Sequence, residues 1–581
     1  MIVSVPQSGH WAGKRTIFLR PTSVNAESEF LARWPLPWTA DESGVYVVHA
    51  SGLPILVRHR LVIGYATPAD REWCRAYLTE ANHSRGPAKL APLDPYDWAA
   101  RLSAEWKPKR YQMAGMERVY RRMTAFGSGN ILADDVGLGK TIQAIGVISR
   151  LRSERVLGNK PGACVLVVTG LSLKSQWRDE IERFSKPVIP TVSVDGPRTE
   201  RIARLGRPAG VYIVNYEMVR DASYKDLIAG LRPVLIVLDE TKAIANPGAA
   251  TTAAVLSLCE RARWTLSFNA TPIENHFGDI YPQVKAADKY LLGDARGFGN
   301  RYLVFGSDRA KVVGHKNAPE FRARAAGVIF RRTHADVGSE MPKVAAVVRP
   351  CRMGKDQFAA YSNACGEFVA GVPVGAVAMA KLAAVRYAAF AADVLDPKSE
   401  SAKADDLEAM LDTELSGERV VVFSCYRRVI EFLARRWAAR GPLVIHSGVS
   451  GKDRADIRRR FNSELGKGRL ILGTAAMSRG MNLQSARVVW SLDLPWNPGA
   501  MRQRIGRVAR IGQTARKVLS VHSRAETPEG GQTVDHWFDL RIFPRKKAAM
   551  IAGLGDDRVR EIGSGAPDPG AVAEFLRRTA G

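Results

Sequence analysis

The sequence predicts an α/β protein with two parallel-sheet lobes in tandem, a helical connector between them and a small N-terminal α+β domain. Short, fully apolar runs occur in two separate groups, and helical segments alternate with them. Strands that are buried on both faces have this pattern, as in a parallel sheet covered by helices. The chain is 581 residues long, which is enough for several domains.

The first group of apolar runs lies within residues 105–343 and predicts the first lobe. Its strands are expected at 164–168, 211–214 and 234–238. The second group lies within residues 420–548 and predicts the second lobe. Its strands are expected at 420–423, 443–445, 470–472 and 488–492. Two sheets of this kind in one chain are most simply explained by two α/β lobes.

The remaining segments are assigned by their local pattern. Residues 344–419 predict a helical connector, because 377–392 is rich in Ala, Leu and aromatic residues and contains no helix breaker. Residues 1–104 contain short β-like runs at 16–19, 45–48 and 54–64 and no chemical motif, so an accessory domain of unknown role is expected. A protein partner for this domain stays open. Residues 549–581 form a C-terminal tail.

The charge balance indicates a polyanionic partner. Lys and Arg total 85 against 58 Asp and Glu, which gives a formal net charge of +27 and a pI near 10.0. Such an excess suits nucleic acid or an anionic membrane surface, with a merely solvated basic surface as the alternative. A composition of 46% hydrophobic and 25% charged residues excludes a disordered chain.

The sequence also indicates the compartment. Its most apolar region, 368–395, is interrupted by Gly, Pro, Lys and Arg, and its N-terminus lacks the layout of a signal peptide. The six cysteines are scattered without a CxxC pair, which favours buried thiols over disulfides or a zinc site. We therefore expect a cytoplasmic protein with no membrane partner.

The strongest local motif is a loop at 133–141 that ends in Gly-Lys-Thr. An apolar strand end precedes it and a helical pattern at 142–151 follows. Backbone N–H groups at a helix N-terminus bind phosphates. Lys140 can reach the outer phosphates, and the Thr141 hydroxyl can hold Mg²⁺. Asp134 stands where the general phosphate-loop motif has Gly. Judged from this segment alone, Gly-Lys-Thr could therefore also occur by chance in an ordinary loop. The predicted ATP-binding residues of the loop are Asp134, Asp135, Val136, Gly137, Leu138, Gly139, Lys140 and Thr141.

A pair of carboxylates follows the predicted strand 234–238. Asp239 at the strand end can bind Mg²⁺, and Glu240 beside it can orient or deprotonate an attacking water. Such a pair is more often a solvated strand end. After a five-residue apolar run downstream of a phosphate loop, the functional interpretation is favoured.

A third element lies in the second lobe at 503–510. Arg507 and Arg510 are three residues apart and would share one face of a helix. Two guanidinium groups suit the charge that develops on a transferring γ-phosphate. A basic helix that contacts DNA or solvent is the alternative. Gln503 begins the element and is grouped with the candidate catalytic residues.

With these elements in order, the sequence resembles the Swi/Snf-type ATPases of helicase superfamily two over about residues 105–548. In that family the phosphate loop begins with Asp, as it does here. The resemblance rests on further matches in the family's order. These are Gln112 for the adenine-side motif; Gln176 and Trp177 for motif Ia; 215–217; Thr271 within 270–275 for motif III; 331–343; 423–424; Ser447 within 446–448; Arg479 and Asn482 within 478–483 for motif V; and Trp496 leading into 503–513 for motif VI.

The resemblance implies two RecA-like lobes that close on ATP and Mg²⁺ and a motor that translocates on duplex DNA. It also implies that Gln112 binds ATP, and it makes Gln176, Trp177 and the motif III to VI residues above candidates for nucleic-acid contact or coupling. Two residues depart from the family's pattern: Lys242 stands where the family usually has His or Gln, and Arg479 where it has a small or acidic residue. Of these, Lys242 is expected to alter how ATP hydrolysis is coupled to DNA binding.

Two alternatives remain. A strand-separating helicase on single-stranded DNA or RNA is disfavoured by residues 496–498 and 510–513, which resemble elements of duplex translocases. A DNA-binding protein with a dead ATPase site is disfavoured because Lys140, Asp239, Glu240 and Arg507 are all present. The compact length favours a bacterial or viral protein, and the pathway is not indicated.

Overall fold

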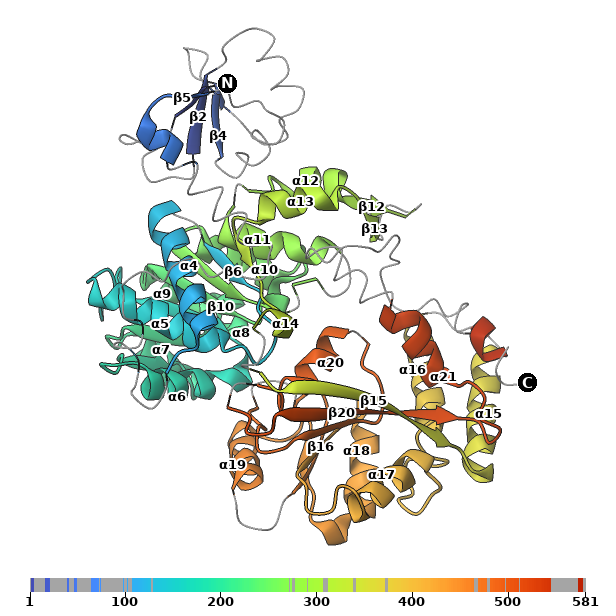
Figure 1. The fold of residues 1–581 in the computed structure, drawn as a ribbon. Helices are drawn as coiled ribbons and strands as arrows, with labels where there is room; N and C mark the ends of the chain where they lie inside the picture. The colour runs from blue at the N-terminus through green and yellow to red at the C-terminus, as the bar shows by residue number, and fades with distance from the viewer. Residues whose placement is uncertain are drawn as a thin grey trace. The chain divides into compact units, whose positions relative to one another are not determined.

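The computed structural model describes residues 2–4, 16–20, 39–40, 46–49, 64–72, 74, 98, 102, 107–126, 129–270, 272–273, 277–289, 291–306, 312–337, 341–370, 375–463, 469–477, 481–496, 498–510, 512–544 and 573–577. These residues divide into two compact units, one ending at Val337 and the other covering the described residues from Met341 on. Figure 1 shows the labelled helices and strands of both units.

The N-terminal region forms a small five-stranded sheet with the order β3-β4-β2-β1-β5. Its strands are β1 (Ile2–Ser4), β2 (Thr16–Arg20), β3 (Thr39–Ala40), β4 (Tyr46–His49) and β5 (Gly64–Tyr65). The expected β-like runs at 16–19 and 45–48 correspond to β2 and β4. Of the run expected at 54–64, only Gly64 lies within the described residues.

The first lobe is built on a seven-stranded sheet with the order β14-β6-β11-β10-β7-β9-β8, in which every pairing is parallel. Its strands are β6 (Asn130–Leu132), β7 (Val165–Thr169), β8 (Thr191–Ser193), β9 (Val211–Asn215), β10 (Leu235–Asp239), β11 (Trp264–Phe268) and β14 (Ile329–Phe330). The predicted strands at 164–168, 211–214 and 234–238 are β7, β9 and β10. Side chains of these three strands alternate between two apolar cores, so both sheet faces are covered.

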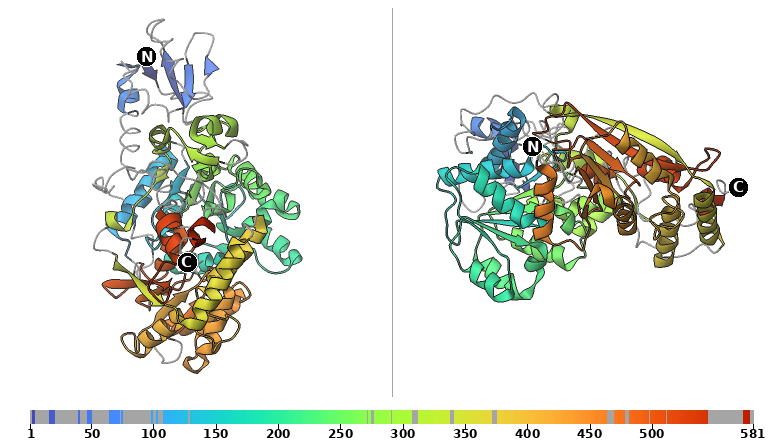
Figure 2. Two further views of the ribbon diagram at one scale, coloured as in Figure 1. Left: turned by 90° about the vertical axis from the view of Figure 1, so that its right-hand side faces the viewer. Right: turned by 90° about the horizontal axis from the view of Figure 1, so that it is seen from below.

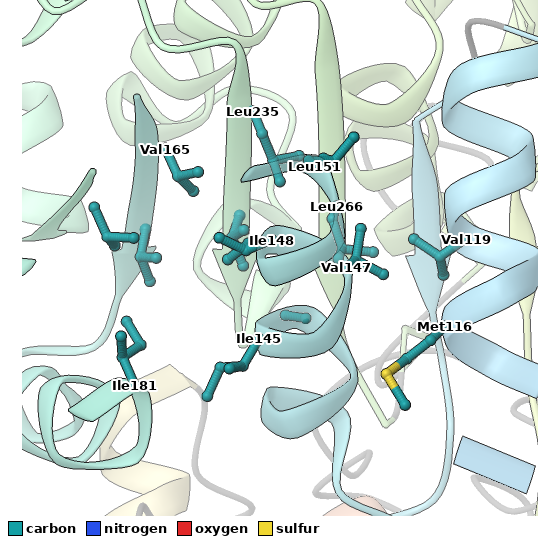
Figure 3. Packing of buried hydrophobic residues seen from close by; sticks show 14 of the residues in the cluster. Met116, Val119, Ile145, Val147, Ile148, Leu151, Val165, Ile181, Leu235 and Leu266 are labelled. Carbon is teal, nitrogen blue, oxygen red and sulfur yellow. The ribbon is translucent and has the colours of Figure 1, made fainter. Parts of the chain in front are cut away.

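Helices form both outer layers of this sheet. One core joins the sheet to α4 (Arg110–Phe126), α5 (Lys140–Ser153) and α6 (Lys174–Phe184). Figure 3 shows Met116 and Val119 of α4 and Ile145 and Ile148 of α5 in this core, together with Val165, Leu235 and Leu266 of the strands. The opposite core contains residues of α8 (Tyr216–Arg220), α9 (Ala222–Gly230) and α10 (Ala250–Cys259).

The end of the first lobe carries a helical extension with an aromatic core. Phe277, Phe298, Tyr302 and Phe321 pack together there. The other elements of this unit are α7 (Arg198–Leu205), α11 (Ile280–Ala287), α12 (Ala295–Tyr302), β12 (Leu303–Phe305), β13 (Val312–His315), α13 (Ala318–Ala325) and α14 (His334–Val337).

The second unit is built on a six-stranded parallel sheet with the order β15-β20-β19-β16-β18-β17. Its strands are β15 (Lys343–Arg352), β16 (Val420–Phe423), β17 (Leu443–Ile445), β18 (Leu470–Gly473), β19 (Val488–Ser491) and β20 (Lys517–Glu526). The four predicted strands of the second lobe are β16, β17, β18 and β19. This unit is therefore a second α/β lobe, and the two-lobe fold class is confirmed.

The helices of the second unit form three groups. Helices α17 (Ala402–Asp412) and α18 (Arg427–Arg436) pack on one face of the sheet. The other face packs against Phe461 of α19 (Gly451–Asn462) and against the segment that follows α20 (Pro498–Ile505). Helices α15 (Lys355–Val369) and α16 (Gly375–Ala388) lie side by side and share a core with α21 (Val534–Trp537) (Figure 2).

The region expected as a helical connector, 344–419, contributes most of strand β15 as well as α15, α16 and α17 to this unit. The helix expected at 377–392 is α16, which ends at Ala388. No helix within the described ranges is long and apolar enough to cross a membrane. All six cysteine thiols are free; Cys425 is half-buried and the others are buried.

Candidate nucleotide site

The predicted phosphate loop connects the end of β6 to the start of α5. Gly137 and Gly139 have φ angles of 89° and 74°, a left-handed conformation that glycine adopts without steric cost. The loop therefore turns sharply and presents the first N–H groups of α5 at its mouth. The strand–loop–helix context that a phosphate loop requires is present.

Lys140 is the first residue of α5. Its ammonium group donates hydrogen bonds to the carbonyl oxygens of Asp134 at 2.7 Å and Asp135 at 3.2 Å. The amine thus lies across the loop, where it can exchange these carbonyls for phosphate oxygens. Thr141 follows on the first turn and is half-buried.

Gln112 supports the phosphate loop from helix α4. It is fully buried; its Oε1 accepts from the Lys109 N–H at 2.9 Å, and its Nε2 donates to the Leu138 carbonyl at 3.2 Å. The Tyr111 hydroxyl donates to the same carbonyl at 3.2 Å. Both side chains fix the loop's main chain, so a change at Gln112 would disturb the loop as well as any adenine contact.

The carboxylate of Asp134 faces the protein interior. It is fully buried and accepts from the Arg332 N–H at 3.0 Å, from Arg332 Nε at 3.1 Å and from Gln143 Nε2 at 3.2 Å. The Arg332 guanidinium also donates to the Tyr111 carbonyl. This buried ion pair satisfies the charged groups it contains and holds the loop in place. The motif at 331–343 was identified from the sequence, but this role of Arg332 was missed.

The next two loop residues are held by the same segment after β14. The His334 N–H donates to Asp135 Oδ2 at 3.2 Å, and His334 Nε2 lies 2.9 Å from the Val136 carbonyl oxygen. Because β14 pairs with β6, this segment reaches the loop directly. The side chains of Asp134 and Asp135 therefore position the loop, and its main chain, Lys140 and Thr141 remain the candidates for contact with ATP.

Asp239 lies at the carboxyl end of β10, as predicted. Its Oδ2 accepts from the Trp177 indole N–H at 2.8 Å and from the Thr169 hydroxyl at 3.2 Å. Burial raises the pKa of this carboxyl, while the two hydrogen bonds and the positive charge of Lys140 act in the opposite direction. Within the described residues Oδ1 accepts no hydrogen bond, which suits an oxygen that binds a cation.

Glu240 has an unusual backbone conformation. Its φ of 51° and ψ of 61° lie in the left-handed region, which a non-glycine residue rarely adopts. The Tyr216 hydroxyl donates to the carbonyl of the preceding Asp239 at 2.8 Å. Departures of this kind are found at functional sites, where the surrounding structure maintains them.

The motif Ia residues have different surroundings. Trp177 of α6 is buried, stacks on Phe268 with ring centroids 6.1 Å apart, and contacts Asp239. Its indole therefore joins helix α6 to the carboxyl end of β10. Gln176 is half-buried and donates to Glu180 Oε1 at 2.6 Å.

The expected arginine helix in motif VI is wrong in its geometry. Helix α20 ends at Ile505, and Arg507 and Arg510 lie in the turns that follow. Beyond the helix, the Leu483 N–H donates to the Arg507 carbonyl at 3.0 Å, and Gln513 Nε2 donates to the Val508 carbonyl at 3.1 Å. Arg507 is 8% exposed, whereas Arg510 and Gln503 are half-buried.

The sequence interpretation missed a buried ionic network behind motif VI. Arg504 of α20 donates to the Asp493 carbonyl oxygen at 2.7 Å and lies 3.4 Å from its carboxylate. Arg386 of α16 is 4.0 Å from the same carboxylate. Burial raises the pKa of Asp493, but the charges of Arg386 and Arg504 and hydrogen bonds from Ser424 and Cys425 together lower the pKa overall. An apolar run that ends in Asp was the available signal.

The remaining candidates are dispersed over the second unit. Ser447 is exposed, and Asn482 is half-buried with its Oδ1 accepting from the Gln484 N–H at 3.3 Å. Trp496 packs edge-on against Phe538 with ring centroids 5.0 Å apart, so its ring is part of the helical core. Thr271 and Arg479 lie outside the described residues.

Comparison with known proteins gives matches along most of the chain. Residues 111–405 match the SNF2-related domain, and residues 402–512 match the helicase conserved C-terminal domain. The chain is 26% identical over 446 residues to the SWI/SNF-related matrix-associated actin-dependent regulator of chromatin subfamily A-like protein 1 of Xenopus tropicalis, with 74% of this chain and 44% of the relative covered. It is 25% identical over 461 residues to the Zorya protein ZorD of Escherichia coli O139:H28, with 70% and 41% covered.

The chain thus spans less than half the length of these curated relatives. A solved structure, the Sulfolobus solfataricus SWI2/SNF2 ATPase core in complex with dsDNA, matches with a TM-score of 0.39 and 22% identity over 81% of this chain and 96% of that chain. The SNF2-related domain alone matches residues 111–405, which is more than half of the chain. The protein therefore belongs to the SNF2-related family.

Proposed function

We propose that the protein is an ATP-driven motor that moves on duplex DNA and displaces or remodels what is bound to it. The observation that carries the proposal is the arrangement of phosphate loop and carboxylate pair in the first lobe. Strands β6 and β10 flank β11 in one parallel sheet, so the loop after β6 and Asp239 after β10 lie at the same edge. Ligands of open α/β sheets bind at this edge.

The residues take distinct roles in this proposal. Lys140 and the N–H groups at the start of α5 bind the phosphates of ATP. Magnesium prefers oxygen ligands and usually binds through one or two carboxylates together with substrate phosphates. The Thr141 hydroxyl and Asp239 Oδ1 fit that donor set. Glu240 would orient or deprotonate the attacking water, and the bound Mg²⁺ would neutralise charge on the phosphates.

The second lobe supplies the arginines of the proposed mechanism. Arg507 and Arg510 would stabilise the charge on the transferring phosphoryl group, with Gln503 beside them. Because these residues belong to another unit than Lys140, hydrolysis would require closure of the two lobes on ATP. Opening after hydrolysis would complete one step along the DNA.

Duplex DNA as the partner rests on family membership and charge. A net charge of +27 favours a polyanion, and contacts to phosphates carry little sequence information. The candidates for these contacts are Gln176, Ser447, Asn482 and the motif III and motif V loops. We also propose the domain boundaries 1–104, 105–343, 344–419, 420–548 and 549–581. A protein partner for residues 1–104 and a cytoplasmic location in a bacterium or in a virus-infected cell remain proposals as well.

The test is to measure ATP hydrolysis in parallel without polymer and with duplex DNA, single-stranded DNA or RNA. We expect the greatest stimulation by duplex DNA, and DNA affinity that falls steeply with salt, with a log–log slope of about −0.9 per neutralised phosphate. Greater stimulation by single strands would favour the helicase alternative, and no hydrolysis at all would favour the non-enzymatic one.

The same assays locate the site. Lys140→Ala is expected to abolish hydrolysis while DNA affinity persists, because the change removes the charge that reaches the outer phosphates. Hydrolysis by this variant within about three-fold of the wild-type rate would contradict the assignment, since an essential phosphate contact should cost far more.

A further inference from the structure

Beside the carboxylate pair lies a glutamine whose amide is fully buried. Gln283 belongs to α11 and is 0% exposed. Its Oε1 accepts from the Thr241 hydroxyl at 2.7 Å and from Asn269 Nδ2 at 2.9 Å. Its Nε2 donates to the carbonyls of Pro272 at 2.7 Å and Asp279 at 2.8 Å. A glutamine amide has two acceptor and two donor positions, so all of them are used.

These contacts join segments that are separate in the sequence. Thr241 directly follows Glu240, and its hydroxyl is held from the side of α11. Asn269 and Pro272 lie at the start of the loop after β11, on either side of residues 270–271. Gln283 therefore connects the loop of the carboxylate pair, the loop after β11 and helix α11.

The connection matters because of the backbone at Glu240. Its left-handed conformation, with φ of 51°, is maintained only if the neighbouring main chain is fixed on both sides. On one side the Tyr216 hydroxyl holds the Asp239 carbonyl. On the other side the fixed point is Thr241, which is fully buried and bonded to Gln283.

We propose that Gln283 is a positioning residue for hydrolysis, which holds Glu240 in its left-handed turn and makes that turn follow the loop after β11. The proposal rests on the proposed ATPase function. Gln283 touches no reacting atom and acts through Thr241. A shift of Pro272 would move its carbonyl, and the Gln283 amide would transmit that shift to Thr241 and Glu240. An amide suits this role because it donates to one loop and accepts from the other.

The primary test is Gln283→Leu, which keeps the side chain's bulk and removes its polar atoms. We expect kcat to fall about 100-fold, as a misplaced reacting group does, while ATP affinity stays within about three-fold of wild type. The ratio of DNA-stimulated to DNA-free turnover should fall as well, because the loop after β11 is no longer connected to the carboxylate pair.

The matched control is Gln357→Leu in the second unit. Gln357 is also 0% exposed; its Nε2 donates to the Ala388 carbonyl at 3.3 Å and its Oε1 accepts from the Ala402 N–H at 2.9 Å. We expect this variant to lose thermal stability while kcat is unchanged at a temperature at which it is folded. An equal loss of kcat in both variants would show a general stability effect and would overturn the proposal.

A second set of variants tests the route through Thr241 and also serves if Gln283→Leu does not fold. Thr241→Val removes only the hydroxyl and should lower kcat about 10-fold with ATP affinity unchanged. Gln283→Glu keeps the acceptors but cannot donate to Pro272, and should lower the stimulation by DNA. In a double-mutant cycle, Thr241→Val should add little to the loss in Gln283→Leu, because both changes remove the same contact. It should add its own loss to Gln283→Glu, which keeps the oxygen that accepts from Thr241.

Two outcomes separate the inference from the function on which it rests. If folded Gln283 and Thr241 variants turn over ATP at the wild-type kcat, the inference is wrong and the ATPase proposal stands. If the wild-type protein hydrolyses no ATP under any condition, the proposed function has failed, and the role of Gln283 fails with it.

Discussion

The two carboxylate oxygens of Asp239 differ in their hydrogen bonding. Oδ2 is held by the indole of Trp177 and the hydroxyl of Thr169, while Oδ1 accepts no hydrogen bond within the described residues. Partners that orient a metal ligand commonly change metal affinity 10- to 100-fold when they are removed. The Trp177 indole is therefore expected to set the direction of Oδ1, the oxygen proposed to bind Mg²⁺.

Trp177→Phe tests this role. The change keeps a ring to stack on Phe268 and removes only the donor. We expect the Mg²⁺ concentration for half-maximal ATP hydrolysis to rise about 10-fold. Trp437→Phe is the control, because Trp437 is 1% exposed and its indole N–H has no hydrogen-bond partner within the described residues. An unchanged Mg²⁺ dependence in Trp177→Phe, or an equal change in the control, would contradict the assignment.

The motifs predicted where residues lie in the fold better than they predicted the partners of those residues. Lys140 and Asp239 lie where their motifs place them, because a strand–loop–helix and an apolar strand end fix both positions. Gln283 could not be found in this way, since a single glutamine in an apolar helix belongs to no motif. Its role depends on which loops pack against α11, and local sequence does not encode that packing.

At the scale of elements, helix α20 is held to its sheet by charge as well as by apolar contacts. Arg504 of α20 and Arg386 of α16 share the carboxylate of Asp493, and all three residues are at most 6% exposed. Asp493 follows β19, so the network connects the sheet with both helices. Removing one member of a buried pair leaves the other charges uncompensated and is strongly destabilising.

Asp493→Asn is therefore expected to lower the free energy of unfolding of the second unit by about 3–5 kcal/mol, measured by denaturant titration at neutral pH. The folded-state pKa of Asp493 lies below its ordinary value of 3.8, so its stabilising contribution is complete above that value. The difference between wild type and variant should shrink as the pH falls below 3.8.

The control for this comparison is Asp412→Asn. Asp412 pairs with Arg440 at 2.7 Å, but its side chain is 56% exposed. An exposed pair of this kind contributes at most about 1 kcal/mol. Equal destabilisation by the two substitutions, or a difference that does not depend on pH, would show that the Asp493 network does not hold α20.

Element prediction succeeded where burial decides the structure. The runs 420–423 and 443–445 have the bounds predicted for them, because strands covered on both faces are continuously apolar. The helix predicted through Arg507 and Arg510 was wrong, because a spacing of three residues occurs in turns as well as in helices. The Arg507 carbonyl accepts from the N–H of Leu483, which lies 24 residues earlier, and the Val508 carbonyl accepts from the amide of Gln513.

At the scale of the whole molecule, the groups proposed for hydrolysis are divided between the two units. Lys140, Asp239 and Glu240 belong to the first unit, and Arg507 and Arg510 belong to the second. Such a division makes hydrolysis depend on the arrangement of the units, which DNA can bias if it binds both. The order of the motifs predicted this division from the sequence. No sequence pattern determines how often the units close.

The arginines provide the test of this dependence. If they only contact DNA, Arg507→Ala and Arg510→Ala would weaken DNA binding and leave DNA-independent turnover intact. If they act on the phosphoryl group, each change should lower turnover by a factor on the order of 10³, the lower end of what such arginines contribute. ATP affinity should persist, because the first unit makes most of the ground-state contacts.

The two positions are not expected to be equivalent. Arg507 is 8% exposed and its carbonyl accepts from the Leu483 N–H, so its main chain is held within its own unit, whereas Arg510 is half-buried. A fixed charge stabilises a transition state without reorganisation, and we therefore expect the larger loss of turnover for Arg507→Ala. DNA affinity, ATP affinity and turnover have to be measured separately for each variant. Reduced DNA affinity with normal DNA-independent turnover would contradict the catalytic assignment and leave these arginines as DNA contacts.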